Sequence, residues 1–340
     1  MNSEPASTEL KAPRSGAFSV GTQLLAFFAG IAGGLAFVQL FSGGLFGVFL
    51  AYLSPLPLFL VGLTCGRAAA VTAMLFALLT VYMRTLSVES TVFYAAVMAV
   101  PVMVMSRVAL IKNQAGQYIS GGIVLLSILM LGTLLMAASA ILLELQGPGI
   151  AAATQVALDN YKAMILENNV NNLPPEQIDQ SLAMVKPALP GVILMSWFLI
   201  ITVTGVLSQW FASEIKQNLR PTPYIKTVEL PLWMVGLFLF CFIGSMVTPT
   251  DTQMVLTALA TLYAAGLVIA GLGAMHRWID AKATVNTWSD GKRLGIYILC
   301  YAAIFILQIP VLFVLLFGLI APFTVWRHSL TNGHSGAANS

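Results

Sequence analysis

Hydrophobic residues of this chain form long runs, and the few charged residues lie almost entirely between them. A run of about 20 apolar residues is long enough to cross a hydrocarbon layer about 30 Å thick as an α-helix. A helix also satisfies its own backbone hydrogen bonds, which lipid cannot do. The runs predict membrane-spanning helices over residues 18–40, 45–63, 68–82, 91–110, 123–143, 191–211, 232–247, 254–275 and 294–323.

The composition of the chain supports this interpretation. Hydrophobic residues make up 58% of the 340 residues, charged residues make up 9%, and the mean hydropathy is +0.88. These values lie far from those of a soluble domain. The sequence therefore predicts an all-α fold, a polytopic transmembrane helical bundle of about 8–10 spans. We expect the bundle over residues 18–327, a cytoplasmic polar tail at 1–17 and a disordered tail at 328–340.

Basic residues recur in alternate connections between the expected spans, beginning with Lys11 and Arg14. Because basic residues resist translocation, their side is expected to be cytoplasmic in a bacterial inner membrane. The N-terminus is then cytoplasmic and the connection 145–190 is extracytoplasmic. Arg84 is the exception, since it falls on the opposite side. The first run is too long for the core of a secretory signal and is expected to stay as an uncleaved helix.

The long polar connection 145–190 predicts a short extracytoplasmic helical hairpin. Apolar residues over 153–165 recur at helical spacing, which indicates a first helix. An asparagine cluster at 168–172 ends this helix. Pro174 and Pro175 then open a second helix, because proline is tolerated in a helical first turn.

The last hydrophobic run, 294–323, is too long for one upright helix and too short for two full crossings. Pro310 interrupts the run. A hairpin or a broken helix that turns at 308–310 is favoured, because a hairpin returns Arg327 to the cytoplasmic side. The alternative is one kinked span that leaves the C-terminus outside.

The motifs of common enzymes do not occur in the sequence, which has no nucleotide-binding loop, HExxH helix or nucleophile elbow. No histidine or carboxylate lies at mid-span, and the three cysteines form no CxxC pair. We therefore expect a protein that is not an enzyme and that needs no cofactor or metal. The net charge of +3 and the dispersed basic residues also argue against nucleic acid as a partner.

Two prolines interrupt the second hydrophobic run next to Ser54. Pro55 and Pro57 remove backbone donors near membrane depth, so the carbonyls that they free must face protein or a wet cavity. Broken helices of this kind form the substrate site of many transporters. The alternative is a proline kink that serves packing. The candidate substrate-binding residues are prolines and neutral polar residues of the expected spans: Ser54, Pro55, Pro57, Gln39, Thr80 and Gln308.

Small residues recur at helix-contact spacing in the first span, at Ala26, Gly30 and Gly34. Small residues let a second helix approach closely. This stripe is a candidate for docking a partner membrane subunit, and the alternative is packing inside the same bundle.

Two segments carry a resemblance to a known family. They are SPLPLFLVGLTCG at 54–66 and ILQIPVLFVLLFGLIAPFTVWRH at 306–328. Both resemble the YybS-like family of uncharacterised bacterial membrane proteins, the domain of unknown function 2232. That family is distantly similar to the substrate-binding subunits of energy-coupling vitamin transporters. The resemblance implies a small solute bound between helices, and a shared membrane partner that docks through Ala26, Gly30 and Gly34.

Two functions follow as hypotheses. The first is an integral membrane protein with a solute-binding or transport-related role, whose partners are the lipid bilayer, a small solute and another membrane subunit. The alternative is a non-transporting membrane scaffold or assembly factor. A polar-lined cavity beside Ser54 and Pro57 would favour the first function, and a closely packed core there would favour the second.

Overall fold

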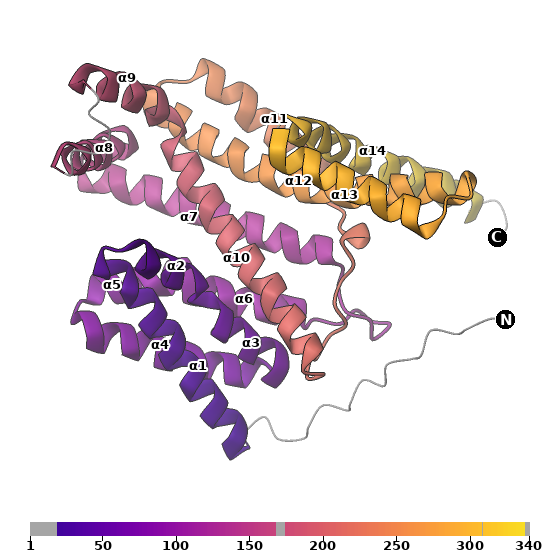
Figure 1. Cartoon of the computed structure of the whole chain (residues 1–340), viewed down its shortest axis with the longest axis horizontal. Helices are drawn as coiled ribbons and strands as arrows, with labels where there is room; N and C mark the ends of the chain where they lie inside the picture. Colours follow the sequence, from indigo (N-terminus) through magenta and orange to yellow (C-terminus); the bar gives the residue numbers. More distant parts are fainter. Residues whose placement is uncertain (1–18, 168–173, 308, 337–340) are drawn as a thin grey trace. The chain divides into compact units, whose positions relative to one another are not determined.

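The fold is helical in the part of the chain that the computed structural model describes, residues 19–167, 174–307 and 309–336 (Figure 1). These ranges contain no β-strand and only one isolated β-bridge, between Lys112 and Tyr118. The predicted all-α class is confirmed.

Seven helical segments of the described residues are long and apolar enough to cross a membrane. The pair Asp290–Leu307 and Pro310–Phe323 is bent by 117°, which fits a broken span or a re-entrant loop. With this pair taken as one span the number is eight, within the expected range. A further apolar helix, Leu232–Val247, is shorter at 16 residues. The seven segments are Val20–Ser42, Leu45–Cys65, Arg67–Thr85, Val88–Ala109, Gly121–Gln146, Glu176–Glu214 and Thr250–Val285.

The chain divides into two compact units, each with its own buried side chains. Unit 1 comprises Met1–Ile119 and Ile200–Thr222, and unit 2 comprises Ser120–Leu199 and Pro223–Ser340. Helix α10 (Leu189–Glu214) contributes residues to both units.

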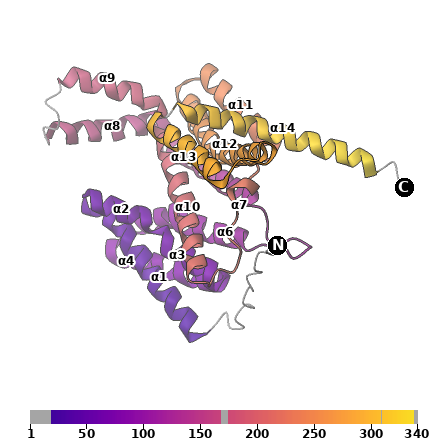
Figure 2. The same cartoon turned by 45° about the vertical axis from the view of Figure 1, so that its right-hand side comes forward.

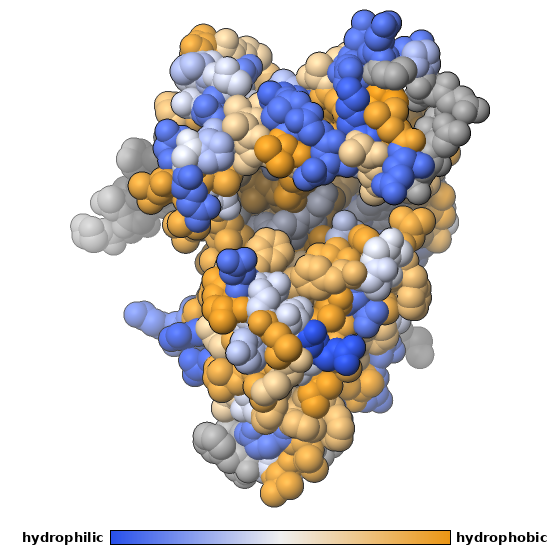
Figure 3. All heavy atoms as spheres, turned by 90° about the vertical axis from the view of Figure 1, so that its left-hand side faces the viewer, coloured by the Kyte–Doolittle hydropathy of each residue, from blue (hydrophilic) through white to orange (hydrophobic). Residues whose placement is uncertain are grey.

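Large apolar side chains are exposed in both units, as contact with a lipid bilayer requires. In unit 1 the exposed fraction reaches 92% at Leu45, and in unit 2 it reaches 87% at Phe305. The face drawn in Figure 3 is mostly apolar, with polar side chains in small groups. Inside a bilayer these side chains meet lipid tails, so their exposure carries no hydrophobic cost.

Unit 1 consists of helices joined by tight turns, and its first helix begins where Ser19 accepts a hydrogen bond from the Thr22 amide. Gly66 joins two helices directly, with a φ of 89° that favours glycine. The elements before α10 are α1 (Val20–Val38), η1 (Gln39–Ser42), α2 (Leu45–Leu53), α3 (Pro55–Cys65), α4 (Arg67–Thr85), α5 (Val88–Tyr94), the π-helical η2 (Ala95–Ala99) and α6 (Val100–Ala109).

Helices α1 and α4 are in close backbone contact in unit 1 (Figure 1). A Cβ atom added to Gly30 would lie 2.4 Å from the Ala73 carbonyl oxygen, and one added to Gly34 would lie 2.8 Å from that of Ala77. Ala26 is fully buried in the same helix. The small-residue stripe therefore packs inside the chain, and docking a partner through it would require α4 to move away.

Gly30→Ala is expected to lower the free energy of unfolding by about 1–3 kcal/mol, because the new methyl group overlaps the Ala73 carbonyl. The matched control is Gly21→Ala in the same helix, where no atom lies within 4 Å of the added Cβ. The measurement is the unfolding midpoint of both variants in lipid nanodiscs. Equal midpoints would contradict the tight α1–α4 contact.

Arg220, which is only 6% exposed, connects three segments of unit 1. Its guanidinium donates to the carbonyl oxygens of Ala109 and Ile119, both at 3.0 Å. Its own carbonyl oxygen accepts from the side-chain amides of Gln209 at 3.0 Å and Asn218 at 2.8 Å. Burial lowers the pKa of the guanidinium, but an arginine stays charged at neutral pH. The buried charge is thus solvated by the carbonyl dipoles of Ala109, at the end of α6, and of Ile119, in the connection that follows α6.

Arg220→Met is expected to destabilise the protein by about 2–4 kcal/mol, because two carbonyl groups lose their donors. Arg107→Met is the control, since Arg107 is an exposed arginine of the same unit and should change stability by less than about 0.5 kcal/mol. Denaturant unfolding of both purified variants measures the difference. An unfolding midpoint for Arg220→Met equal to that of the wild type would contradict a stabilising role of these hydrogen bonds.

Unit 2 contains the longer helices of the chain, and α12, α13 and α14 lie side by side in it (Figure 1). Besides the first part of α10, its elements are α7 (Gly121–Gln146), α8 (Gly149–Glu167), α9 (Pro175–Val185), η3 (Lys186–Ala188), η4 (Ile225–Thr227), α11 (Leu232–Val247), α12 (Thr250–Val285), α13 (Asp290–Leu307) and α14 (Pro310–Gly336).

Glycines also allow the backbones of α12 and α14 to meet. A Cβ atom on Gly271 would lie 2.0 Å from the Val314 carbonyl oxygen, and one on Gly318 would lie 2.0 Å from that of Leu267. Neither position tolerates a side chain without separation of the two helices. Gly318 is therefore a packing residue.

The two short helices predicted for the polar connection are α8 and α9, which lie side by side (Figure 2). An ion pair between Lys162 and Asp179 joins them, and Leu158 and Ile178 are buried. The asparagine cluster at 168–172 lies outside the described residues. Helix α14 extends to Gly336. The expected tail at 328–340 lies partly outside the described residues, and its disorder stays a prediction.

Candidate functional site

The helix break predicted around Ser54 is present between α2 and α3. Pro55 and Pro57 have no N–H group, and the Ala51 carbonyl oxygen accepts from the Ser54 amide at 3.2 Å instead. Ser54 keeps helical angles, with φ −50° and ψ −39°. The break is therefore an interruption of hydrogen bonding with little change in the local backbone conformation.

Protein groups, rather than an open cavity, surround Ser54. Its side chain is fully buried, and its hydroxyl donates to the Tyr94 hydroxyl at 3.4 Å. Gly33 lies so close that an added Cβ would be 3.0 Å from the Ser54 carbonyl oxygen. Ser208 of α10 donates to the Leu56 carbonyl oxygen at 3.0 Å. The core beside Ser54 is therefore closely packed. Sequence reasoning did not single out Tyr94 as a partner of Ser54.

The other candidate substrate-binding residues lie farther along α1 and α4. Thr80 donates to the Phe76 carbonyl oxygen at 2.7 Å and packs against Gly34, so its hydroxyl is bonded within α4. Gln39 is half-buried at the start of η1. Gln308 lies outside the described residues. The structure thus places Ser54 and Thr80 against neighbouring glycines of α1, with Gln39 about one turn beyond.

A largely open hollow of about 320 Å³ lies where α1 and α4 end in unit 1. It is lined by Val38 and Phe41 from the end of α1 and from η1, by Arg84 and Thr85 from the end of α4, and by Ser90 of α5. Two left-handed residues turn the chain beside it, Gly43 with φ 77° and Leu86 with φ 50°. The close packing of α1 on α4 sets the distance between its two walls.

The polar groups that line the hollow differ in the hydrogen bonds and ion pairs that they already form within the protein. Thr85 donates to the Val81 carbonyl oxygen at 2.9 Å and accepts from the Ser87 amide at 3.3 Å. Arg84 is exposed, and among the described residues its guanidinium forms no ion pair and no hydrogen bond. Phe41 is 58% exposed. The hollow therefore offers a free cation beside an aromatic ring.

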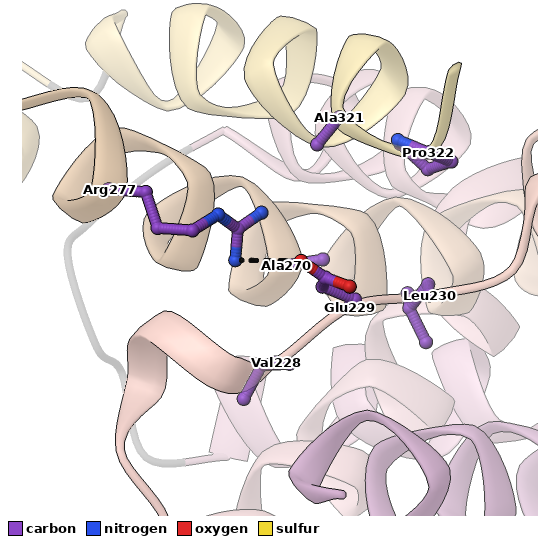
Figure 4. A pocket seen from close by; sticks show the side chains of 7 residues that line it. All are labelled: Val228, Glu229, Leu230, Ala270, Arg277, Ala321 and Pro322. Atoms are coloured by element: carbon purple, nitrogen blue, oxygen red, sulfur yellow. Dashed lines mark ion pairs between the residues drawn. The ribbon is translucent and has the colours of Figure 1, made fainter. Parts of the chain in front are cut away.

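A second pocket, in unit 2, is too small for a solute. It measures about 10 Å³, close to the minimum that holds one water molecule. Figure 4 shows Arg277 reaching from α12 toward Glu229, with Ala321 and Pro322 of α14 above them. The guanidinium and the carboxylate are 3.5 Å apart. Paired charges and helix packing close this pocket.

A polar network next to this pocket joins η4, α12 and α13. Asp280 pairs with Lys226 and accepts from the Tyr297 hydroxyl at 2.7 Å. His276 is 2.8 Å from the Tyr301 hydroxyl, and its ring stacks on that of Tyr297 at 4.4 Å. The sequence does not indicate these contacts, because Tyr297 and Tyr301 lie 21 and 25 residues from His276 in the chain. The network satisfies these polar groups within the protein.

Metal-binding clusters of three or more histidine, cysteine or acidic side chains do not occur in the searched, described part of the chain. In unit 2 the two charged side chains that line the small pocket, Arg277 and Glu229, are paired with each other. The hollow in unit 1, with its free arginine, is therefore the candidate functional site.

The fold defines a multi-pass helical membrane protein. The chain belongs to the family described as Predicted membrane protein (DUF2232), which matches residues 26–324. No curated protein and no solved structure matches the chain.

Proposed function

We propose that this membrane protein binds a small solute in the hollow of unit 1, in a solute-binding or transport-related role. The hollow carries the proposal: its volume of about 320 Å³ reaches the lower end of the range for small-molecule sites. Its lining combines apolar side chains with a few polar groups, which is typical of such sites. The break at Ser54 then supports the wall of the site through Gly33 and Tyr94 without touching the solute.

The cellular setting is part of the same proposal. The alternation of basic connections favours a bacterial inner membrane with a cytoplasmic N-terminus. The hollow and the α8–α9 hairpin then both face the extracytoplasmic side. We propose that the protein acts there by binding and not by catalysis.

We also propose that the chain is YybS-like and distantly similar to the substrate-binding subunits of energy-coupling vitamin transporters. In those subunits a solute binds between helices and an early helix docks a shared partner. In this chain the helix ends of α1 and α4 offer the space for a solute. The docking stripe Ala26, Gly30 and Gly34 is covered by α4, so a partner would have to use another surface or separate these helices.

Val38→Trp is expected to abolish solute binding, because the larger side chain fills the hollow that Val38 lines. Val20→Trp is the matched control, since Val20 begins the same helix and is 77% exposed. The measurement is uptake or retention of a broad panel of labelled solutes in a deletion strain that carries each variant at equal membrane levels. Unchanged handling of the whole panel in the deletion strain would contradict a solute-binding role.

The second candidate function is a non-transporting membrane scaffold or assembly factor, which the close packing around Ser54 favours. A scaffold needs no cavity, only a stable partner. Crosslinking in membranes followed by affinity purification is expected to recover one membrane protein in a fixed ratio. An unrelated multi-pass protein with the same tag is the control, and recovery of no specific partner would exclude this function.

A further inference from the structure

We propose that the hollow binds an anionic group, a phosphate or carboxylate on an apolar body, and that Arg84 is its counter-charge. This inference rests on the proposed function, because it names the class of solute that the hollow would bind.

Arg84 differs from Arg277 and Glu229, the charged side chains that line the small pocket of unit 2. Arg277 is paired with Glu229 at 3.5 Å, so its charge is balanced within the protein. Arg84 has no such pair, and Glu89, the nearest carboxylate in the sequence, forms no ion pair with it. The hollow thus holds an uncompensated positive charge.

The remaining lining groups suit the rest of such a ligand. A guanidinium presents a planar fork of donors that matches two oxygens of a phosphate or carboxylate. The Ser90 hydroxyl makes no hydrogen bond within the described residues and can donate to a third oxygen. Val38 and Phe41 line the other side of the hollow and can cover an apolar body.

The anion has two sources. Leu86 and Val88, next to the hollow, are 77% and 66% exposed, as residues in contact with lipid are. A phosphate of an anionic lipid headgroup can therefore reach Arg84 along the membrane surface, and a free solute can reach it from water. The lipid headgroup and the free solute both present an anionic group that a guanidinium can bind.

The test uses the full-length protein in nanodiscs of phosphatidylcholine with phenyl phosphate as the probe and benzyl alcohol as its neutral counterpart. We expect phenyl phosphate to bind, to lose at least about tenfold in affinity with Arg84→Gln, and to bind more weakly at high salt. Arg84→Lys should retain part of the affinity. Arg67→Gln is the matched control, because Arg67 is an exposed arginine at the opposite end of the same helix.

The outcomes separate this inference from the function beneath it. If Arg84→Gln binds phenyl phosphate as the wild type does, or if benzyl alcohol binds equally well, the anionic site is refuted while solute binding stands. If no probe of any charge binds, both the anionic site and the proposed solute binding are refuted. Nanodiscs that contain phosphatidylglycerol identify the source of the anion. A lower apparent affinity for phenyl phosphate in the wild type, but not in Arg84→Gln, assigns the site to a lipid headgroup. An unchanged affinity assigns the site to a free solute.

Discussion

Close contact between helix backbones, made possible by glycine, is the constraint on which both units depend. Lipid tails are as apolar as leucine side chains, so burial drives helix association in a bilayer only weakly. Packing at short range must supply the attraction. Gly30 and Gly34 allow α4 to meet α1, and Gly271 and Gly318 allow α14 to meet α12. These contacts set the spacing of the helix ends, and the spacing of the ends of α1 and α4 sets the width of the hollow.

Polar groups at the irregular points of the fold are satisfied by distant parts of the chain. An unsatisfied backbone group costs several kcal/mol in hydrocarbon, so each break in a helix requires partners. At the break, the Ala51 carbonyl oxygen, which has no donor from Pro55, accepts from the Ser54 amide. Ser208 donates to the Leu56 carbonyl oxygen, and Tyr94 accepts from the Ser54 hydroxyl. The turns at the other end of unit 1 obtain them from Arg220, which is buried among carbonyl oxygens.

Several exposed charges of the described residues form no ion pair, and Arg84 is distinguished among them because it lines the hollow. The ionisable groups near the end of α12 balance one another, with Asp280 and Glu229 opposite Lys226 and Arg277. Arg84 has no such balance, although it lies beside a hollow of useful size. Its departure from the alternation of basic connections and its lack of a protein partner agree with a role toward something outside the chain.

The sequence by itself determined the helical class, the positions of most helices, the break at Ser54 and the interruption before Pro310. These features depend on local physics: the length of an apolar run, and the missing N–H group of proline. It also identified Arg84 as an exception, but not as a member of a site. Only the tertiary structure decided that Tyr94 lies against Ser54, that α4 covers the stripe at Gly30, and that Arg84 shares a hollow with Val38 and Phe41. At each of these places residues far apart in the chain meet because of how the helices cross and how closely they are spaced. Hydrophobic periodicity does not indicate which helices become neighbours.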